Sequence, residues 1–169
     1  MTELADPGAV DYAMLERELS ALLGDEPDRI ANASNTAALL FHRLPDVSWV
    51  GFYFAVPAED DVGRELVLGP FQGKPACVRI AWGRGVCGTA AARRETQRVD
   101  DVHAFEGHIA CDPSSRSELV VPLADDAGTL IGVLDLDSES AARFTTQDQA
   151  GIETLALCFM ATWPRGAGS

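Results

Sequence analysis

Three cysteines lie close together in the chain, in or beside glycine-bordered segments. They are Cys77, Cys87 and Cys111, and their spacing excludes a local CxxC pair. Loop closure can still bring such thiols together, and neighbouring thiols can pass through sulfenic acid and disulfide states in a relay. Cys158 differs from them, because it lies in the apolar helical stretch ETLALCFMATW and is expected to be a small core hydrophobe.

Zinc binding is an alternative for the same cysteines. Zn²⁺ takes four ligands of this kind, and the sequence offers Cys77, Cys87 and Cys111 with either His103 or His108. Structural zinc sites usually contain at least one closely spaced pair, and here only His108 and Cys111 are close. The spacing therefore argues against a zinc site.

Carboxylic acids form a second group of candidates. Asp135 and Asp137 alternate with leucines in GVLDLDS, which places both carboxylates on one face of a strand. Glu118 begins the preceding strand, whose expected partner is this one, although its own face is not fixed by the sequence. Carboxylates on one concave surface repel one another, so that one tends to keep a proton, as a general acid must. On the pattern alone, a solvated sheet face is the simpler interpretation.

The aromatic residues of VSWVGFYFAV are a third group. Trp49 and Tyr53 are four positions apart, so they face the same side of a strand. Phe52 and Phe54 do not share that face with Trp49. Aromatic stripes on strands more often belong to the core than to a ligand-binding wall.

Periodicity and turn signals predict the elements that position these groups. Apolar spacing and capping residues predict helices over 11–23, 28–43 and 144–163, with caps at Asp11 and at Thr145 or Thr146. Strand-like composition marks 47–56, 65–71, 77–82, 118–123 and 129–138, and a glycine-led loop and helix spans 83–95. Residues 100–116 show no clean period, and the excursion 97–116 is a candidate lid.

The order of these elements predicts the fold class. Strands joined by hairpins, without regular strand–helix alternation, favour an antiparallel sheet with helices packed on one side. The 169 residues are expected to form a single domain, 1–169. The net charge of −13 argues against nucleic acid as a partner. No signal peptide or membrane-spanning run is visible, so we expect a soluble cytoplasmic protein.

Long segments of the chain resemble the free methionine-R-sulfoxide reductases. The similar segments are GPFQGKPACVRIAWGRGVCGTAA, DVHAFEGHIACDPSSRSELVVPL, IGVLDLDS and ANASNTAALLFHRLPDVSWVGFYF. The resemblance implies an α+β (α/β sandwich) domain of the GAF type, with a central antiparallel sheet flanked by helices. It also implies an enzyme that reduces free L-methionine-(R)-S-oxide to L-methionine and does not act on methionine sulfoxide within proteins.

The resemblance also implies a role for each candidate. Cys111 corresponds to the family's nucleophile and Cys77 to its resolving cysteine, while Cys87 is a relay or auxiliary thiol. The acidic site residues of the family match Glu118, Asp135 and Asp137, which are expected to be both catalytic and substrate-binding. Its aromatic pocket wall matches Trp49 and Tyr53. His108 stays undecided, since it can orient the loop without taking part in the chemistry.

Partners follow from the same resemblance. Thioredoxin is the expected electron donor, and the relay requires no metal or organic cofactor. Dimerisation is common in the family, and the sequence fixes no interface. The alternative function is a GAF small-ligand-binding sensor module without turnover.

Overall fold

A six-stranded antiparallel sheet forms the centre of the protein. The structure is a computed structural model that describes residues 9–57, 63–107 and 111–163. The strands are β1 (Trp49–Pro57), β2 (Arg64–Gln72), β3 (Arg79–Ala81), β4 (Gln97–Val99), β5 (Ser117–Ala124) and β6 (Leu130–Ser138). They lie in the order β3-β2-β1-β6-β5-β4, and every neighbouring pair is antiparallel. The antiparallel sheet predicted from the hairpins is confirmed.

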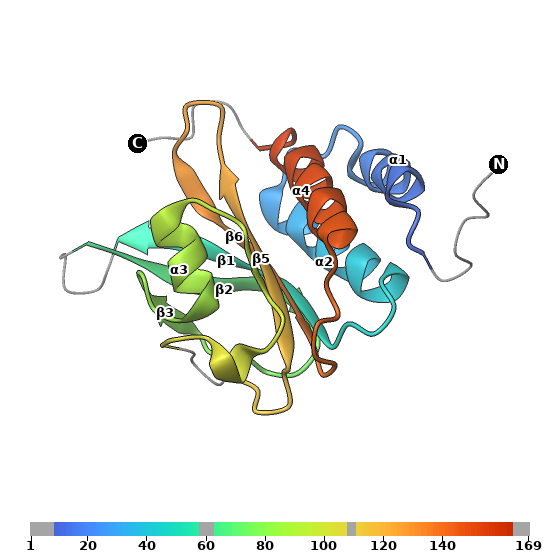
Figure 1. The fold of residues 1–169 in the computed structure, drawn as a ribbon. Helices are drawn as coiled ribbons and strands as arrows, with labels where there is room; N and C mark the ends of the chain where they lie inside the picture. The colour runs from blue at the N-terminus through green and yellow to red at the C-terminus, as the bar shows by residue number, and fades with distance from the viewer. Residues whose placement is uncertain (1–8, 58–62, 108–110, 164–169) are drawn as a thin grey trace.

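Helices cover both faces of this sheet (Figure 1). They are α1 (Tyr12–Leu23), α2 (Arg29–Arg43), α3 (Gly85–Arg93) and α4 (Thr146–Met160), with a short 3₁₀ turn η1 (Val102–Ala104). The first, second and fourth helices pack on one face, and α3 packs on the other. The prediction that helices pack on one side is therefore wrong. The hairpin connections between strands do not determine on which face α3 packs. The small side chains of Ala90 and Ala91, both fully buried, allow α3 to pack against the second face.

The helix ends agree with the capping residues in the sequence. The Asp11 carboxylate accepts a hydrogen bond from the Met14 backbone N–H (2.9 Å) at the start of α1. Thr145 and Asp148 cap α4 reciprocally, each side chain accepting from the other's backbone N–H. These bonds satisfy N–H groups that a helix leaves unpaired in its first turn.

Side-chain alternation divides the interior into two cores. Phe52, Leu134 and Leu136 point toward the three-helix face, where they pack with the helices in the larger core. Tyr53 and Val133 point the other way, toward α3. Since successive side chains of a strand point to opposite faces, the odd-numbered residues of β1 and β6 share the α3 face. This face carries the candidate site.

Three local predictions differ from the structure. The strand expected over 77–82 is limited to Arg79–Ala81, which pairs with β2. Cys77 lies outside the strand and is bound to Cys111 and to the Tyr53 hydroxyl. The excursion 97–116 is not one irregular loop: it begins with β4, which pairs with β5, and continues through η1. Cys158 is only half-buried, with its Sγ 3.2 Å from Ser20 Oγ, because it lies at the margin between α1 and α4.

Within the described segments, none of the helices has the length and hydropathy that crossing a bilayer requires.

Candidate active site

The register of three strands places the predicted acids next to one another. Asp137 lies opposite Trp49 of β1 on one side and opposite Glu118 of β5 on the other. Asp135 lies opposite Gly51 of β1. All these positions are on the α3 face, so the register decides the face of Glu118 that the sequence left open. Glu118 and Asp135 are only 7% and 5% exposed, which rules out the solvated-face interpretation for them.

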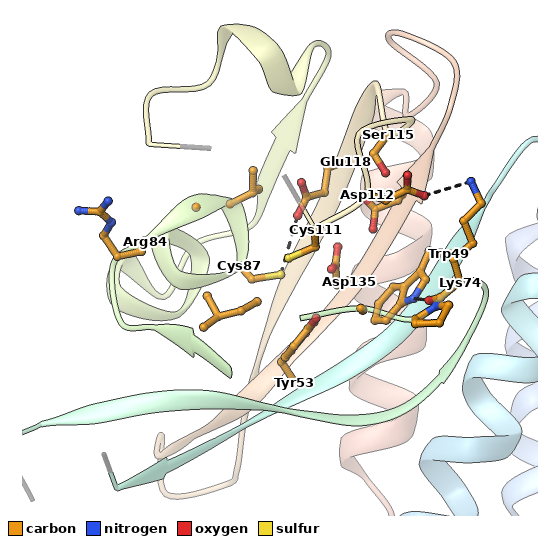
Figure 2. A pocket seen from close by; sticks show the side chains of 16 residues that line it. Trp49, Tyr53, Lys74, Arg84, Cys87, Cys111, Asp112, Ser115, Glu118 and Asp135 are labelled. Carbon is orange, nitrogen blue, oxygen red and sulfur yellow. Dashed lines mark hydrogen bonds and ion pairs between the residues drawn. The ribbon is translucent and has the colours of Figure 1, made fainter. Parts of the chain in front are cut away.

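These acids line a cavity between the sheet, α3 and the segment that carries Cys111 (Figure 2). Its volume is about 620 Å³ when the open solvent at its mouth is included. Every predicted site residue except Cys77 lines it. Arg84 also lines the cavity, with its guanidinium directed away from the carboxylates in Figure 2.

Burial sets the protonation of the acids. It raises the pKa of Asp135 to about 7. Burial, together with the negative charge of Asp135, raises the pKa of Glu118 and the pKa of Asp137 well above their usual values. The cluster therefore retains protons at neutral pH, the state that a proton donor needs. The Oδ1 atom of Asp135 is buried without a hydrogen-bond partner among the described residues, so a bound ligand with a donor group would satisfy it.

Cys87 brings a thiol into the same cluster from the first turn of α3. Its Sγ donates a weak hydrogen bond to Glu118 Oε1 over 3.8 Å. Burial and the nearby Asp135 charge raise the pKa of this thiol well above its ordinary value. Cys87 is thus held as a neutral thiol, unlike an exposed nucleophilic cysteine.

Cys77 and Cys111 are joined by a disulfide, with their Cα atoms 5.6 Å apart. The bond links the segment before β3 to the segment before β5, and both cysteines are half-buried. The alternative zinc set is therefore not assembled in this state, because two of its cysteines bind each other. His108, the other residue close to Cys111, lies outside the described residues.

Both aromatic residues hold the segment that carries Cys77. Trp49 Nε1 donates to the Lys74 carbonyl (3.0 Å), and the Tyr53 hydroxyl donates to the Cys77 carbonyl (2.9 Å). Their rings are stacked with centroids 6.0 Å apart. Gly51 makes this possible, since a Cβ at that position would lie 2.5 Å from the Trp49 ring. The pair therefore forms one wall of the cavity and also fixes Cys77.

A network of charged side chains closes the edge of the cavity beside the disulfide. Lys74 Nζ lies 3.4 Å from an Asp112 carboxylate oxygen and 3.2 Å from Glu139 Oε1, and it donates to Ser114 Oγ (3.1 Å). Lys74 lies three positions before Cys77 and Asp112 directly follows Cys111. The network therefore ties the two cysteine segments together. Because Lys74 is largely exposed, each ion pair contributes little alone.

The residues of this network were not predicted as site residues, and neither was Ser115. Ser115 lines the cavity and hydrogen-bonds to Asp137, which lowers the Asp137 pKa that burial raises. The proximity of Lys74 and Asp112 to the cysteines was a usable signal. Ser115 offered none, since its partner is 22 positions away and only the register brings them together.

Replacing Tyr53 by phenylalanine tests whether this residue positions Cys77. The substitution keeps the ring and deletes the hydrogen bond to the Cys77 carbonyl, which is worth about 1 kcal/mol, or roughly fivefold in a rate. We expect the disulfide between Cys77 and Cys111 to form several-fold more slowly, with little change in the attack of Cys111 on substrate that the family resemblance implies as the step before it. Rapid-quench measurement of disulfide formation separates its rate from the rate of the step before it. An unchanged rate of disulfide formation would show that Tyr53 is only part of the wall.

The fold and the site define the class of protein. The GAF domain model matches residues 28–160, so the chain belongs to the GAF domains. It is 54% identical over 144 residues to the free methionine-R-sulfoxide reductase of Escherichia coli, covering 85% of this chain and 83% of that protein. Within the GAF domains, the chain belongs to the free methionine-R-sulfoxide reductase family.

Solved structures of this family agree closely with the fold. The free methionine-R-sulfoxide reductase from Neisseria meningitidis in complex with its substrate is 44% identical, covering 96% of this chain and 93% of that chain, with a TM-score of 0.85. The reduced form of fRMsr of Staphylococcus aureus is 43% identical, covering 97% of this chain and all of that chain, with a TM-score of 0.84. The GAF-type fold predicted from the sequence is confirmed.

Proposed function

We propose that this chain reduces free L-methionine-(R)-S-oxide to L-methionine through a cysteine relay. The observation that carries the proposal is a cluster of buried, proton-retaining carboxyl groups that shares one cavity with a cysteine disulfide. Sulfoxide reduction needs both components, a thiol to accept the oxygen and an acid to protonate it. The family relationship supports the same substrate.

The first half of the reaction transfers oxygen to the enzyme. The thiolate of Cys111 attacks the sulfoxide sulfur, and a protonated carboxyl among Glu118, Asp135 and Asp137 donates a proton to the oxygen. Methionine leaves with its sulfur reduced, and Cys111 is left as a sulfenic acid. Because Glu118 and Asp135 are buried, the proton is supplied by the protein itself.

The second half restores the thiol. The Cys77 thiol attacks the sulfenic sulfur of Cys111, so that water leaves and the disulfide forms. A dithiol protein of the thioredoxin class then reduces the disulfide by thiol–disulfide exchange. The half-buried position of Cys77 and Cys111 supports this step, because an external thiolate can approach them. Such a donor also favours a reducing compartment, the cytoplasm.

The cavity walls account for selectivity. With the sulfoxide oxygen at the acids, the R epimer directs its S-methyl group toward Trp49 and Tyr53. The S epimer would direct that methyl group against the carboxyl groups, leaving buried polar atoms unpaired. The Lys74 network borders one edge of the cavity, where we expect it to hinder the flanking residues of a peptide substrate.

Comparing free and capped substrates tests the proposal. We expect the enzyme, supplied with a dithiol reductant, to release methionine from free L-methionine-(R)-S-oxide. Its kcat/KM for the N-acetyl, C-amide derivative should be lower by at least about 100-fold, since two backbone groups gain bulk in an enclosed site. Amino-acid analysis measures both products. Equal rates would contradict the closed-pocket account, and no methionine from either would favour a ligand-binding GAF module.

Replacing Cys77 by serine isolates the first half of the reaction. Without the resolving thiol, Cys111 should remain as sulfenic acid after one oxygen transfer. We expect a burst of roughly one methionine per enzyme, followed by a stall, when a thioredoxin system is the only reductant. Quantifying methionine against enzyme concentration checks this. Continued turnover that is lost when Cys87 is also replaced would assign the resolving role to Cys87 instead.

A further inference from the structure

Three residues with metal-ligating atoms line the cavity side by side. The Cys87 Sγ atom and one carboxylate oxygen each from Glu118 and Asp135 lie within 4.8 Å of one another. All three residues are buried. They come from three different elements, α3, β5 and β6, which contact one another. The arrangement is therefore fixed by the fold and not by one flexible loop.

The donor atoms match the preferences of zinc. Zn²⁺ binds cysteine sulfur at about 2.3 Å and carboxylate oxygen at about 2.0–2.2 Å, so tetrahedral sulfur and oxygen ligands stand roughly 3.5 Å apart. The distance from Cys87 Sγ to Glu118 Oε1 is 3.8 Å. The three donor atoms lie within 4.8 Å of one another, so a central ion would draw the furthest pair together by up to about 1.3 Å. Three protein ligands leave a fourth position free, and all three residues line the cavity from which a fourth ligand would come.

A second observation points to a missing ligand. Asp135 Oδ1 is buried and has no hydrogen-bond partner among the described residues. Glu118 and Asp137 add further acidic groups around it, while Lys74 is engaged with Asp112 and Glu139 at the rim. A dication would bind the unpaired oxygen, and it would displace the protons that the Cys87 thiol and the carboxyl groups hold in the absence of metal.

We propose that, when no substrate occupies the cavity, Cys87, Glu118 and Asp135 bind a zinc ion whose fourth ligand comes from the cavity. Binding would exclude substrate, because the ion uses the carboxylates that the sulfoxide needs. This zinc set differs from the one considered in the sequence, since it uses neither disulfide cysteine nor a histidine. Metal binding itself does not depend on the reductase activity, and only the competition with substrate rests on the proposed function.

Cobalt titration of the oxidised protein tests the site. With the Cys77–Cys111 disulfide intact, Cys87 is the only free thiol lining the described cavity. We expect Co²⁺ to produce thiolate-to-cobalt charge-transfer absorption at one ion per chain, and Zn²⁺ to displace it. Folded, oxidised wild-type protein that gives no such absorption and takes up no Zn²⁺ would overturn the proposal.

Matched variants locate the ion. Cys87→Ser should abolish the charge-transfer absorption and weaken Zn²⁺ binding by at least about tenfold. Losing a residue that only hydrogen-bonds to a metal ligand already weakens metal affinity by about that much, and Cys87 is itself a ligand. Glu118→Gln should weaken binding while keeping the absorption, which covers the case in which Cys87→Ser does not fold. Cys158→Ser, outside the cavity, should leave both unchanged. Unaltered binding in Cys87→Ser, or its loss in Cys158→Ser, would contradict the assignment.

Competition separates this inference from the proposed function. Oxidised enzyme cannot turn over, so free L-methionine-(R)-S-oxide should act on it as a simple ligand and displace Co²⁺. Zinc binding without turnover in the reduced enzyme would support the metal site and contradict the reductase proposal. Turnover without zinc binding would support the reductase proposal and contradict the metal site. Metal that stays bound at saturating substrate would show that the two sites do not overlap.

Discussion

Replacing Cys111 by serine should abolish turnover, lowering kcat by at least about 1,000-fold. A serine hydroxyl is a weak nucleophile toward sulfur at neutral pH, and it cannot form the sulfenic acid that Cys77 resolves. The loss should come without unfolding, since Cys111 is only half-buried and lies in a loop segment. Steady-state rates with free L-methionine-(R)-S-oxide, together with circular dichroism, check both parts.

The matched control for this variant is Cys158→Ser. Its thiol lies between α1 and α4, away from the cavity, and its contact is with Ser20. We expect this variant to keep wild-type kcat. Substantial multiple-turnover activity in Cys111→Ser would show that Cys111 is not the nucleophile and would make Cys87 the next candidate.

Replacing Asp135 by asparagine should make the protein more stable above neutral pH while impairing its activity. The folded pKa of Asp135 is about 7, above its unfolded value, so the folded state binds this proton more tightly. The contribution of Asp135 to the free energy of unfolding is fully present below the pKa that the residue has in the unfolded chain. It is lost as the pH rises through about 7, the pKa in the folded protein. At pH ~8 the cost of the buried charge is on the order of 2–4 kcal/mol, and asparagine removes it.

Denaturant unfolding at two pH values measures this effect. At about pH 8, Asp135→Asn should exceed wild type in free energy of unfolding, and the difference should shrink toward pH ~4.5. Its kcat/KM should fall by at least about 100-fold, since general acids contribute that much. Lower stability of the variant at the higher pH would contradict the buried-charge account. Unchanged kcat/KM would remove Asp135 from the proton-donating cluster.

Period-two alternation is the reason that much of the site was predictable. GVLDLDS placed Asp135 and Asp137 on one face, and VSWVGFYFAV placed Trp49 and Tyr53 on one face, without any tertiary information. Both assignments are confirmed by the strand register. The caps at Asp11 and Thr145 were predictable for a similar reason, since side chain and backbone are neighbours in sequence.

Features that depend on packing could not be predicted in this way. The three residues of β4 form a strand only because β5 offers its edge. The position of α3 on the second face, and hence the place of Cys87 against Glu118, depends on which sheet surface is left uncovered. The sequence alone also gave no pairing between Cys77 and Cys111. Only the family resemblance implied it.

The most direct test of the central claim is NADPH consumption in a coupled thioredoxin and thioredoxin reductase assay. Free L-methionine-(R)-S-oxide and its S epimer are compared side by side, with protein whose thiols are shown to be reduced. The relay and the pocket geometry predict rapid turnover that is confined to the R epimer. Absence of turnover with both epimers, or equal turnover with each, would contradict the account.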